Sequence, residues 1–332
     1  LSYTDIQHQT PLQTQHTTQA HAWYYRKFPH TKVNKMIPIG KHLERCNSKY
    51  NEIIGFPHVI NTYFDDKLLP ALYRLEKNAL KFNSKFDDYF KPKCKKFSIK
   101  ENHIYGWYNP YTTTGRPVNN FNGINFVGLK HDNGERDCFE PDNDFFVEMD
   151  YDGYHPRLIG DIVGYRFHGN VHNELAQIYF KSKEITPQQY KESKTLTFKQ
   201  IYGGIDKANL HHPFFRKTQD FINIIWEEFN NKGEIICGGY EIKKENHPKI
   251  HAQKLFNYYI QATETYTNVE KINEIQDYLE DKKTKLVLYI YDAFIFDVSK
   301  QDGKQTLIDL ENILSEKFPI KLKIGEHYGA LS

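Results

Sequence analysis

The chain has 332 residues, of which 26% are charged, and its formal net charge is +2. This near-neutral balance is not that of a general nucleic-acid binder, so any such role has to rest on local charge. The four cysteines are scattered without paired spacing, which argues against zinc ribbons and disulfide scaffolds and predicts a reducing, intracellular setting. No stretch is long and apolar enough to span a bilayer.

The first part of the chain divides into a polar opening, a helical segment and a short basic run. Residues 7–21 are rich in Gln, Thr and His, which predicts a mobile arm. The chain starts at Leu1 without the basic and apolar regions of a signal peptide, and we expect a part of a longer protein. Apolar residues at helical spacing over residues 49–90 predict one or two long helices. The basic run at 91–96 fits a solvated loop and a nucleic-acid contact equally.

Two later segments predict strands that end at an aspartate. Residues 144–150 form a β-like run ending at Asp150, and Pro156 then stands where the first turn of a helix tolerates it. Residues 286–298 read as a hydrophobic hairpin with Asp292 at its turn. Two carboxylates that leave an apolar layer can meet and bind a metal ion. The alternative for each is a surface turn or helix cap, the common role of an isolated Asp.

Between the two aspartates, a predicted helix carries a cation and two rings on one face. Lys194, Phe198 and Tyr202 recur every fourth residue. Thr186 and the following proline are start signals, and the glycine pair after Tyr202 ends the helix. A cation, a flat ring and a phenol suit the binding of a nucleoside triphosphate. On an amphipathic helix, however, such residues more often belong to the hydrophobic core and its edge than to a binding site.

The remaining blocks complete an ordered set. A Thr-Gly-Arg block ending at Arg116 precedes Asn-rich residues 119–125, helical spacing covers residues 213–229 and 252–279, and residues 318–325 predict a last strand.

In this order the blocks resemble the motifs of family A DNA polymerases, the group of bacterial DNA polymerase I and the phage T7 enzyme. The resemblance runs from about residue 72 to the C-terminus. Each block alone is weak, and the ordered set is specific. The matching segments are the Thr-Gly-Arg block, residues 150–157 (motif A), Lys194, Phe198, Tyr202 and Gly203 (motif B), residues 291–293 (motif C), residues 72–77, residues 170–172, and residues 257–264, which are similar to N-x-P-[IM]-Q-G-T-A.

The resemblance implies an α+β right-hand polymerase fold with an antiparallel palm sheet, compact helical fingers and a reduced helical thumb. The expected parts are a partly disordered N-terminal arm (1–48), the thumb (49–100), a palm segment with the Thr-Gly-Arg block and motif A (101–185), fingers with motif B (186–250) and a palm segment with motif C (251–332).

The resemblance also implies a template-directed DNA polymerase that extends a primer 3′-hydroxyl with dNTPs, using two Mg²⁺ ions for which Mn²⁺ can substitute. Primer-template DNA and dNTPs are the expected partners, with other replication proteins or an upstream domain as further ones. The expected setting is viral, plasmid or organellar DNA replication, in the cytoplasm, host cytoplasm or nucleoid. Two alternatives stay open: a single-subunit RNA polymerase-like enzyme, and a degenerate fold that only binds primer-template.

The resemblance assigns roles residue by residue. The catalytic residues are Asp150, Asp292 and Lys194, and the metal ligands are Asp150, Asp292 and the carbonyl of Tyr151. The dNTP-binding residues are Tyr151, His155, Lys191, Lys194, Phe198 and Tyr202. The DNA-binding residues are Arg116, Asn119, Asn122, Asn257 and Gln261.

Three positions depart from the family pattern. The motif A glutamate that excludes ribonucleotides is His155, the second carboxylate of motif C is Ala293, and the first arginine of motif B is Tyr190. These changes bear on sugar selection, metal affinity and triphosphate binding, and they fit the degenerate alternative. Retention of Asp150 and Asp292 favours the enzyme.

Overall fold

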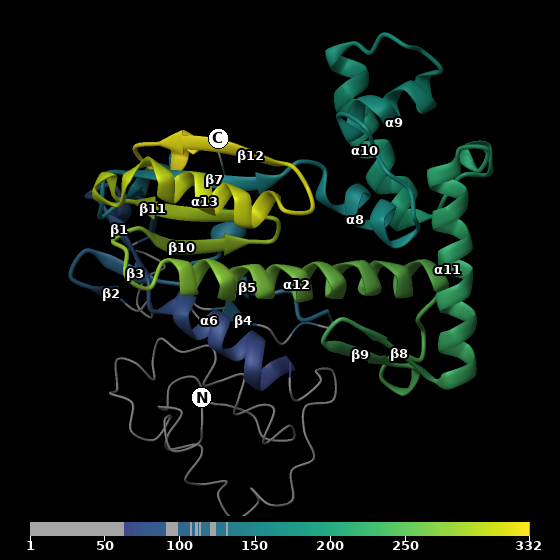
Figure 1. The fold of residues 1–332 in the computed structure, drawn as a ribbon, viewed down its shortest axis with the longest axis horizontal. Coiled ribbons are helices and arrows are strands. Elements are labelled where there is room, and N and C mark those ends of the chain that lie inside the picture. Colours follow the sequence, from purple (N-terminus) through teal and green to yellow (C-terminus); the bar gives the residue numbers. More distant parts are fainter. Residues whose placement is uncertain are drawn as a thin grey trace, which may run out of the picture. The chain divides into compact units, whose positions relative to one another are not determined.

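The structure is a computed structural model. It divides into two compact units (Figure 1), of which unit 1 comprises the chain up to Asp150 and from Thr267 onward, and unit 2 comprises residues 151–266. The second boundary falls inside the long helix α12 (Ala252–Tyr278). The expected arm at 1–48, the basic run at 91–96 and Asn122 lie outside the described residues. The structure describes residues 63–90, 99–106, 108–109, 112, 114–119, 124–130 and 132–331.

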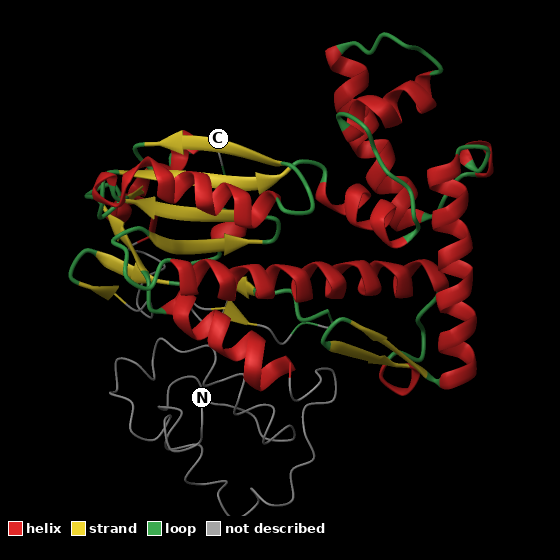
Figure 2. Ribbon diagram, in the orientation of Figure 1, coloured by secondary structure: helices red, strands yellow, loops and turns green. Residues whose placement is uncertain are grey.

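Unit 1 is built on a four-stranded sheet in the order β10-β11-β7-β12 (Figure 2). The strands are β7 (Phe145–Tyr151), β10 (Lys285–Ile290), β11 (Ala293–Val298) and β12 (Ile320–Gly325), and α13 (Gly303–Ser315) links the last two. β10, β11 and β7 pair antiparallel. The strands predicted at residues 144–150, 286–298 and 318–325 are therefore confirmed.

Along β7, the side chains that point to one face of the sheet change from apolar to acidic. Side chains alternate between the two faces of a strand, so Phe146, Glu148 and Asp150 share a face. Their partners on β11 are Asp297, Ile295 and Ala293 respectively. Phe146 and Ile295 belong to a buried hydrophobic cluster, whereas the two acids continue the same face towards the strand end.

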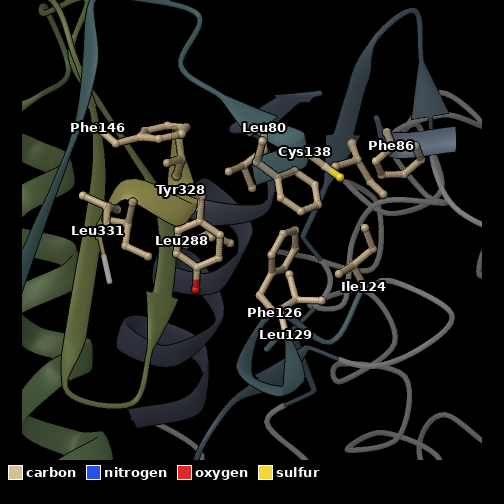
Figure 3. Close-up of a cluster of buried hydrophobic side chains, with 14 of the residues drawn as sticks. Leu80, Phe86, Ile124, Phe126, Leu129, Cys138, Phe146, Leu288, Tyr328 and Leu331 are labelled. Carbon is tan, nitrogen blue, oxygen red and sulfur yellow. The ribbon is translucent and has the colours of Figure 1, made fainter. Parts of the chain in front are cut away.

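The hydrophobic cluster lies between this sheet and a smaller one (Figure 3). The smaller sheet has the order β2-β3-β1-β6, formed by β2 (Ile99–Lys100), β3 (His103–Tyr105), β1 (Ala79–Phe82) and β6 (Phe139–Glu140). Aromatic rings fill the cluster, and Phe126 and Phe139 meet edge to face with centroids 5.2 Å apart. Such packing fixes the larger sheet from one side.

The helices expected over residues 49–90 are interrupted by a strand in the part that the structure describes. The π-helical segment η2 (Phe64–Leu68) leads directly into α6 (Leu69–Glu76), and β1 separates this helix from the five-residue α7 (Phe86–Phe90). Leu80 continues the helical spacing of the sequence, but it lies in β1 and packs in the cluster. Apolar spacing alone does not distinguish a short buried strand from a helix segment.

The outer edge of β10 is covered by side chains of unit 1. The N–H of Tyr289 donates to the Tyr108 hydroxyl at 3.0 Å, and the amide of Asn78 donates to the Leu286 carbonyl at 2.8 Å. Tyr108 lies in β4 (Tyr108–Asn109), which pairs with β5 (Val118–Asn119). These bonds occupy backbone groups that an edge strand otherwise offers to another chain.

Unit 2 is mainly helical, as the sequence pattern predicts. It contains α8 (Tyr154–Ile162), α9 (Val171–Phe180), α10 (Pro187–Gly203), α11 (Pro213–Lys232), the hairpin of β8 (Glu234–Cys237) and β9 (Tyr240–Lys243), and the first part of α12. α10 begins with a capping box between Thr186 and Gln189, which confirms the predicted helix start. Among the helices described, none is both long and apolar enough to cross a membrane.

The turn between β10 and β11 has an unusual backbone that a buried asparagine holds. Tyr291 has a φ of 60°, a region that favours glycine. The side-chain amide of Asn268, which is fully buried, donates to the Tyr291 carbonyl at 2.9 Å and to the Tyr289 hydroxyl at 3.0 Å. Both amide hydrogens therefore have acceptors. This turn carries Asp292.

We expect Asn268→Ala to lower the free energy of unfolding by roughly 2–4 kcal/mol, because two acceptors in a buried region lose their donor. Asn273→Ala, on the same helix, removes an exposed hydrogen bond to the Lys67 carbonyl and should cost about 1 kcal/mol or less. Urea denaturation of both variants measures the difference. Equal losses would show that Asn268 does not hold the turn.

Candidate active site

Asp150 and Asp292 come together in unit 1 at the end of the larger sheet. Asp150 pairs in register with Ala293, and Asp292 is the turn residue directly before Ala293. Burial and the charge of Asp292 are the two largest causes that raise the pKa of Asp150 to about 7. The negative charges of the two carboxylates therefore repel each other, as is typical of two acids that share a site.

Other charges of unit 1 also act on Asp150. Glu148 raises its pKa further, whereas Lys323 and Lys321 of β12 lower it. Glu148 is 9% exposed and forms an ion pair with Lys323, with 3.0 Å between Nζ and Oε1. Glu148 was not among the expected site residues, although the alternation of β7 places it on the face of Asp150.

The donor atoms at this sheet end fit a hard cation such as Mg²⁺. Carboxylate oxygens are the ligands that Mg²⁺ prefers, and the cation usually keeps water or substrate phosphate as further ligands. Within the described ranges, no group of three or more His, Cys, Asp or Glu side chains is arranged to hold a metal ion. Two aspartates would therefore bind it together with oxygens from the backbone, phosphates or water. The backbone carbonyl expected for this, that of Tyr151, belongs to the residue after Asp150.

The Thr-Gly-Arg block lies against the same turn. Gly115 has a φ of 67° and donates its N–H to the Thr112 carbonyl at 3.0 Å, so the block forms a tight turn that suits glycine. The Arg116 guanidinium lies over the Tyr291 ring, 3.6 Å from its centroid. Two blocks far apart in sequence, the Thr-Gly-Arg block and motif C, are thus neighbours in unit 1.

Asn119, which was also expected to bind DNA, has a buried side chain. Asn119 is 5% exposed and pairs in register with Tyr108 across β4 and β5. Its side chain is therefore buried in unit 1, next to the tyrosine that covers the edge of β10. The sequence gives no sign of this, because an Asn-rich stretch is equally typical of a surface.

In unit 2, four of the six predicted nucleotide-binding residues lie on one face of α10. Lys191, Lys194 and Phe198 are exposed and Tyr202 is half-buried, while the opposite face of the helix is buried. Lys194 lies 4.9 Å from the ring centroid of Tyr190, within range of a cation–π contact. Phe198 and Tyr202 stack with an interplanar angle of 7°. Phe198 is 43% exposed, which is unusual for so large an apolar ring.

Tyr151, which the resemblance also assigns to the nucleotide site, is 5% exposed. Its ring stacks on that of Tyr154 with centroids 4.4 Å apart. Gly153 between them has a φ of 65°, and a Cβ there would lie 3.1 Å from Val171. The link from β7 to α8 is therefore tight and its rings are packed.

His155 contacts Tyr202 and Glu264, all three within unit 2. Its Nδ1 hydrogen bonds with the Tyr202 hydroxyl, and its Nε2 lies 3.1 Å from Oε2 of Glu264 in α12. Glu264 was not among the expected site residues, although the segment 257–264 ends on this acid where the similar family segment has alanine.

Two other residues of α12 that were predicted to bind DNA lie in unit 2. The Asn257 amide donates to the Tyr202 carbonyl at 3.3 Å, so Asn257 supports the end of α10. Gln261 lies one turn further along α12 and is half-buried.

Comparison with known proteins gives a likeness in fold. No family model matches the sequence, and no curated protein matches it. Among solved structures, the POL domain of Pol1 from M. smegmatis, in complex with DNA primer-template and dNTP, is similar with a TM-score of 0.60 and 14% identity. The match covers 70% of this chain and 49% of that chain, so this chain spans about half the length of that protein. At this identity the likeness concerns the fold alone, and the chain has a polymerase-like fold of helices and antiparallel strands.

Proposed function

We propose that the chain is a template-directed DNA polymerase of the family A type, which extends a primer 3′-hydroxyl with dNTPs. The observation that carries the proposal is the meeting of Asp150 and Asp292 at the end of a sheet in a polymerase-like fold. The similar solved structure holds primer-template DNA and dNTP, which supports DNA and nucleotide binding here. Replication of viral, plasmid or organellar DNA is the proposed setting.

In this proposal, unit 1 binds the divalent ions and the primer end. Two ions roughly 3.5–4 Å apart stabilise both the entering and the leaving oxygen of a phosphoryl transfer. Asp150 and Asp292 are the proposed ligands, with the carbonyl of Tyr151. Arg116 lies against the turn that carries Asp292, and it is the proposed contact to the primer terminus.

Unit 2 binds the nucleotide in the same proposal. Lys194 holds triphosphate oxygens by charge-assisted hydrogen bonds, and its ammonium is exposed on α10 for this task. The exposed ring of Phe198 offers a flat apolar surface to the base or sugar. Tyr202 stacks on Phe198 and extends that surface towards His155.

A second candidate function is a degenerate fold that binds primer-template without synthesis. Ala293 favours it, because this alanine pairs with Asp150 where the family has another carboxylate. A primer-extension assay decides between the two. Absence of any incorporation by the wild-type chain, together with intact DNA binding, would favour the degenerate fold.

Asp150→Ala and Asp292→Ala should each abolish primer extension and leave primer-template binding largely intact, because the metal ligands are lost while the contacts to the DNA backbone remain. Extension and gel-shift assays measure the two effects. Asp281→Ala is the matched control, since Asp281 is an exposed acid of unit 1 and should keep full activity. Robust synthesis by either site variant would remove that aspartate from the active centre.

Lys194→Ala should weaken dNTP binding and slow incorporation by about 10- to 150-fold, the equivalent of roughly 1.5–3 kcal/mol for a hydrogen bond to a charged group. DNA affinity should change little. Lys199→Ala removes an exposed lysine from another face of the same helix and should have a small effect. Steady-state incorporation kinetics test this, and a loss of DNA binding with unchanged dNTP kinetics would contradict the assignment.

Asp150→Asn should raise the stability of the chain at about pH 8 in a chelator by up to roughly 4 kcal/mol. The folded pKa of about 7 exceeds the ordinary 3.8, so folding binds a proton between these values and stability falls as pH rises through that window. The gain should vanish below about pH 4, where the wild-type carboxyl is neutral in both states.

Mg²⁺ should then raise the melting temperature of the wild type at about pH 8 and have a smaller effect on Asp150→Asn, because the ion binds the charged carboxylate of the folded chain. Thermal unfolding with chelator or Mg²⁺ over a range of pH measures both effects. Equal responses of the two proteins to Mg²⁺ would contradict the metal site without any reference to activity.

A further inference from the structure

Glu264 is a fully buried acid that faces an imidazole. Its relative exposure is 0%, and Oε2 lies 3.1 Å from Nε2 of His155. A buried carboxylate is costly unless donors satisfy its oxygens. At 3.1 Å the two groups are at ion-pair distance without a formed hydrogen bond, and the carboxylate favours the form of the ring that carries hydrogen on Nε2.

The same contact sets the direction of the other ring nitrogen. With Nε2 directed at Glu264, Nδ1 is directed at the Tyr202 hydroxyl, with which it is hydrogen bonded. The two rings also meet edge to face, with centroids 5.8 Å apart. The His155 side chain is only 12% exposed, so few other orientations are open to it.

The contacts continue from this buried pair to the surface of α10. Tyr202 stacks on Phe198, with centroids 6.0 Å apart, and Phe198 is 43% exposed. Three elements of unit 2, α12, α8 and α10, thus contribute one residue each to a chain of polar contacts that ends beside an exposed aromatic face. A change at Glu264 reaches that face through His155 and Tyr202.

We propose that Glu264 is a positioning residue for sugar selection, and that it acts by orienting His155 against Tyr202. This inference rests on the proposed function. The carboxylate that is missing at His155 in motif A stands behind that residue on α12, where the similar family segment has alanine. The imidazole thereby becomes a fixed wall for the nucleotide sugar, and it would be a mobile side chain without Glu264.

The test compares insertion of matched dNTP and rNTP pairs by the wild type, Glu264→Ala and Glu264→Gln. Glu264→Ala should lower the dNTP/rNTP ratio by about 3- to 10-fold, the effect of losing one buried polar contact. Glu264→Gln should recover most of the ratio, because its amide oxygen still faces Nε2 of His155. The ratio compares two substrates of one preparation, so a smaller folded fraction does not change it.

Thr265→Ala is the matched control. Thr265 is fully buried on the same helix and bonds to the Gln261 carbonyl at 2.9 Å, so its truncation disturbs α12 next to Glu264. The control should keep the wild-type ratio. A wild-type ratio in Glu264→Ala, or an equal fall in Thr265→Ala, would overturn the proposal.

A second measurement does not depend on activity or on the folding of Glu264→Ala. Nitrogen-15 NMR of the histidine rings in the full chain, with His155→Gln to assign the signals, should show hydrogen on Nε2 of His155 in the wild type. A neutral ring with hydrogen on Nδ1 alone would overturn the positioning role. If the wild type inserts no nucleotide, the proposed function fails, and the NMR result still decides whether Glu264 orients His155.

Discussion

The electrostatic cost of holding two carboxylates at one end of a buried sheet is the constraint on which unit 1 depends. Burial and Asp292 raise the pKa of Asp150, so the site is least favourable when it is fully charged and empty of cations. The surrounding structure must hold the acids in place against this cost. Pairing of β7 with β11 does so, since a slip of one residue would turn Asp150 to the opposite face. Asn268 holds the turn at Tyr291 for the same reason.

The two units use buried polar groups in the same way, to position groups that are more exposed. In unit 1, Asn268 is fully buried and bonds to the turn of Asp292, while Arg116 packs on the ring of Tyr291. In unit 2, Glu264 is fully buried and orients His155. Polar groups without exposure have few alternative partners, so they specify one geometry more strictly than an apolar contact does.

Sequence pattern identified the elements that depend on local signals. The strand ending at Asp150, the hairpin at Asp292 and the capped helix α10 all follow from short-range periodicity and turn residues. It did not identify two roles that depend on contacts between distant segments. Asn119 is interior because β5 pairs with β4, and Glu264 matters because α12 passes α8 within unit 2. Periodicity carries no information on such contacts.

The alanine in motif C bears directly on the choice between an enzyme and a degenerate fold. Ala293 pairs with Asp150, so a carboxylate at this position would add a third negative charge beside the pair and raise the pKa of Asp150 further. The methyl group avoids this, and both carboxylates proposed as metal ligands remain. Glu148 is already close enough to raise that pKa, and its ion pair with Lys323 partly offsets its charge. The loss of one acid at Ala293 is therefore compatible with metal binding at the other two.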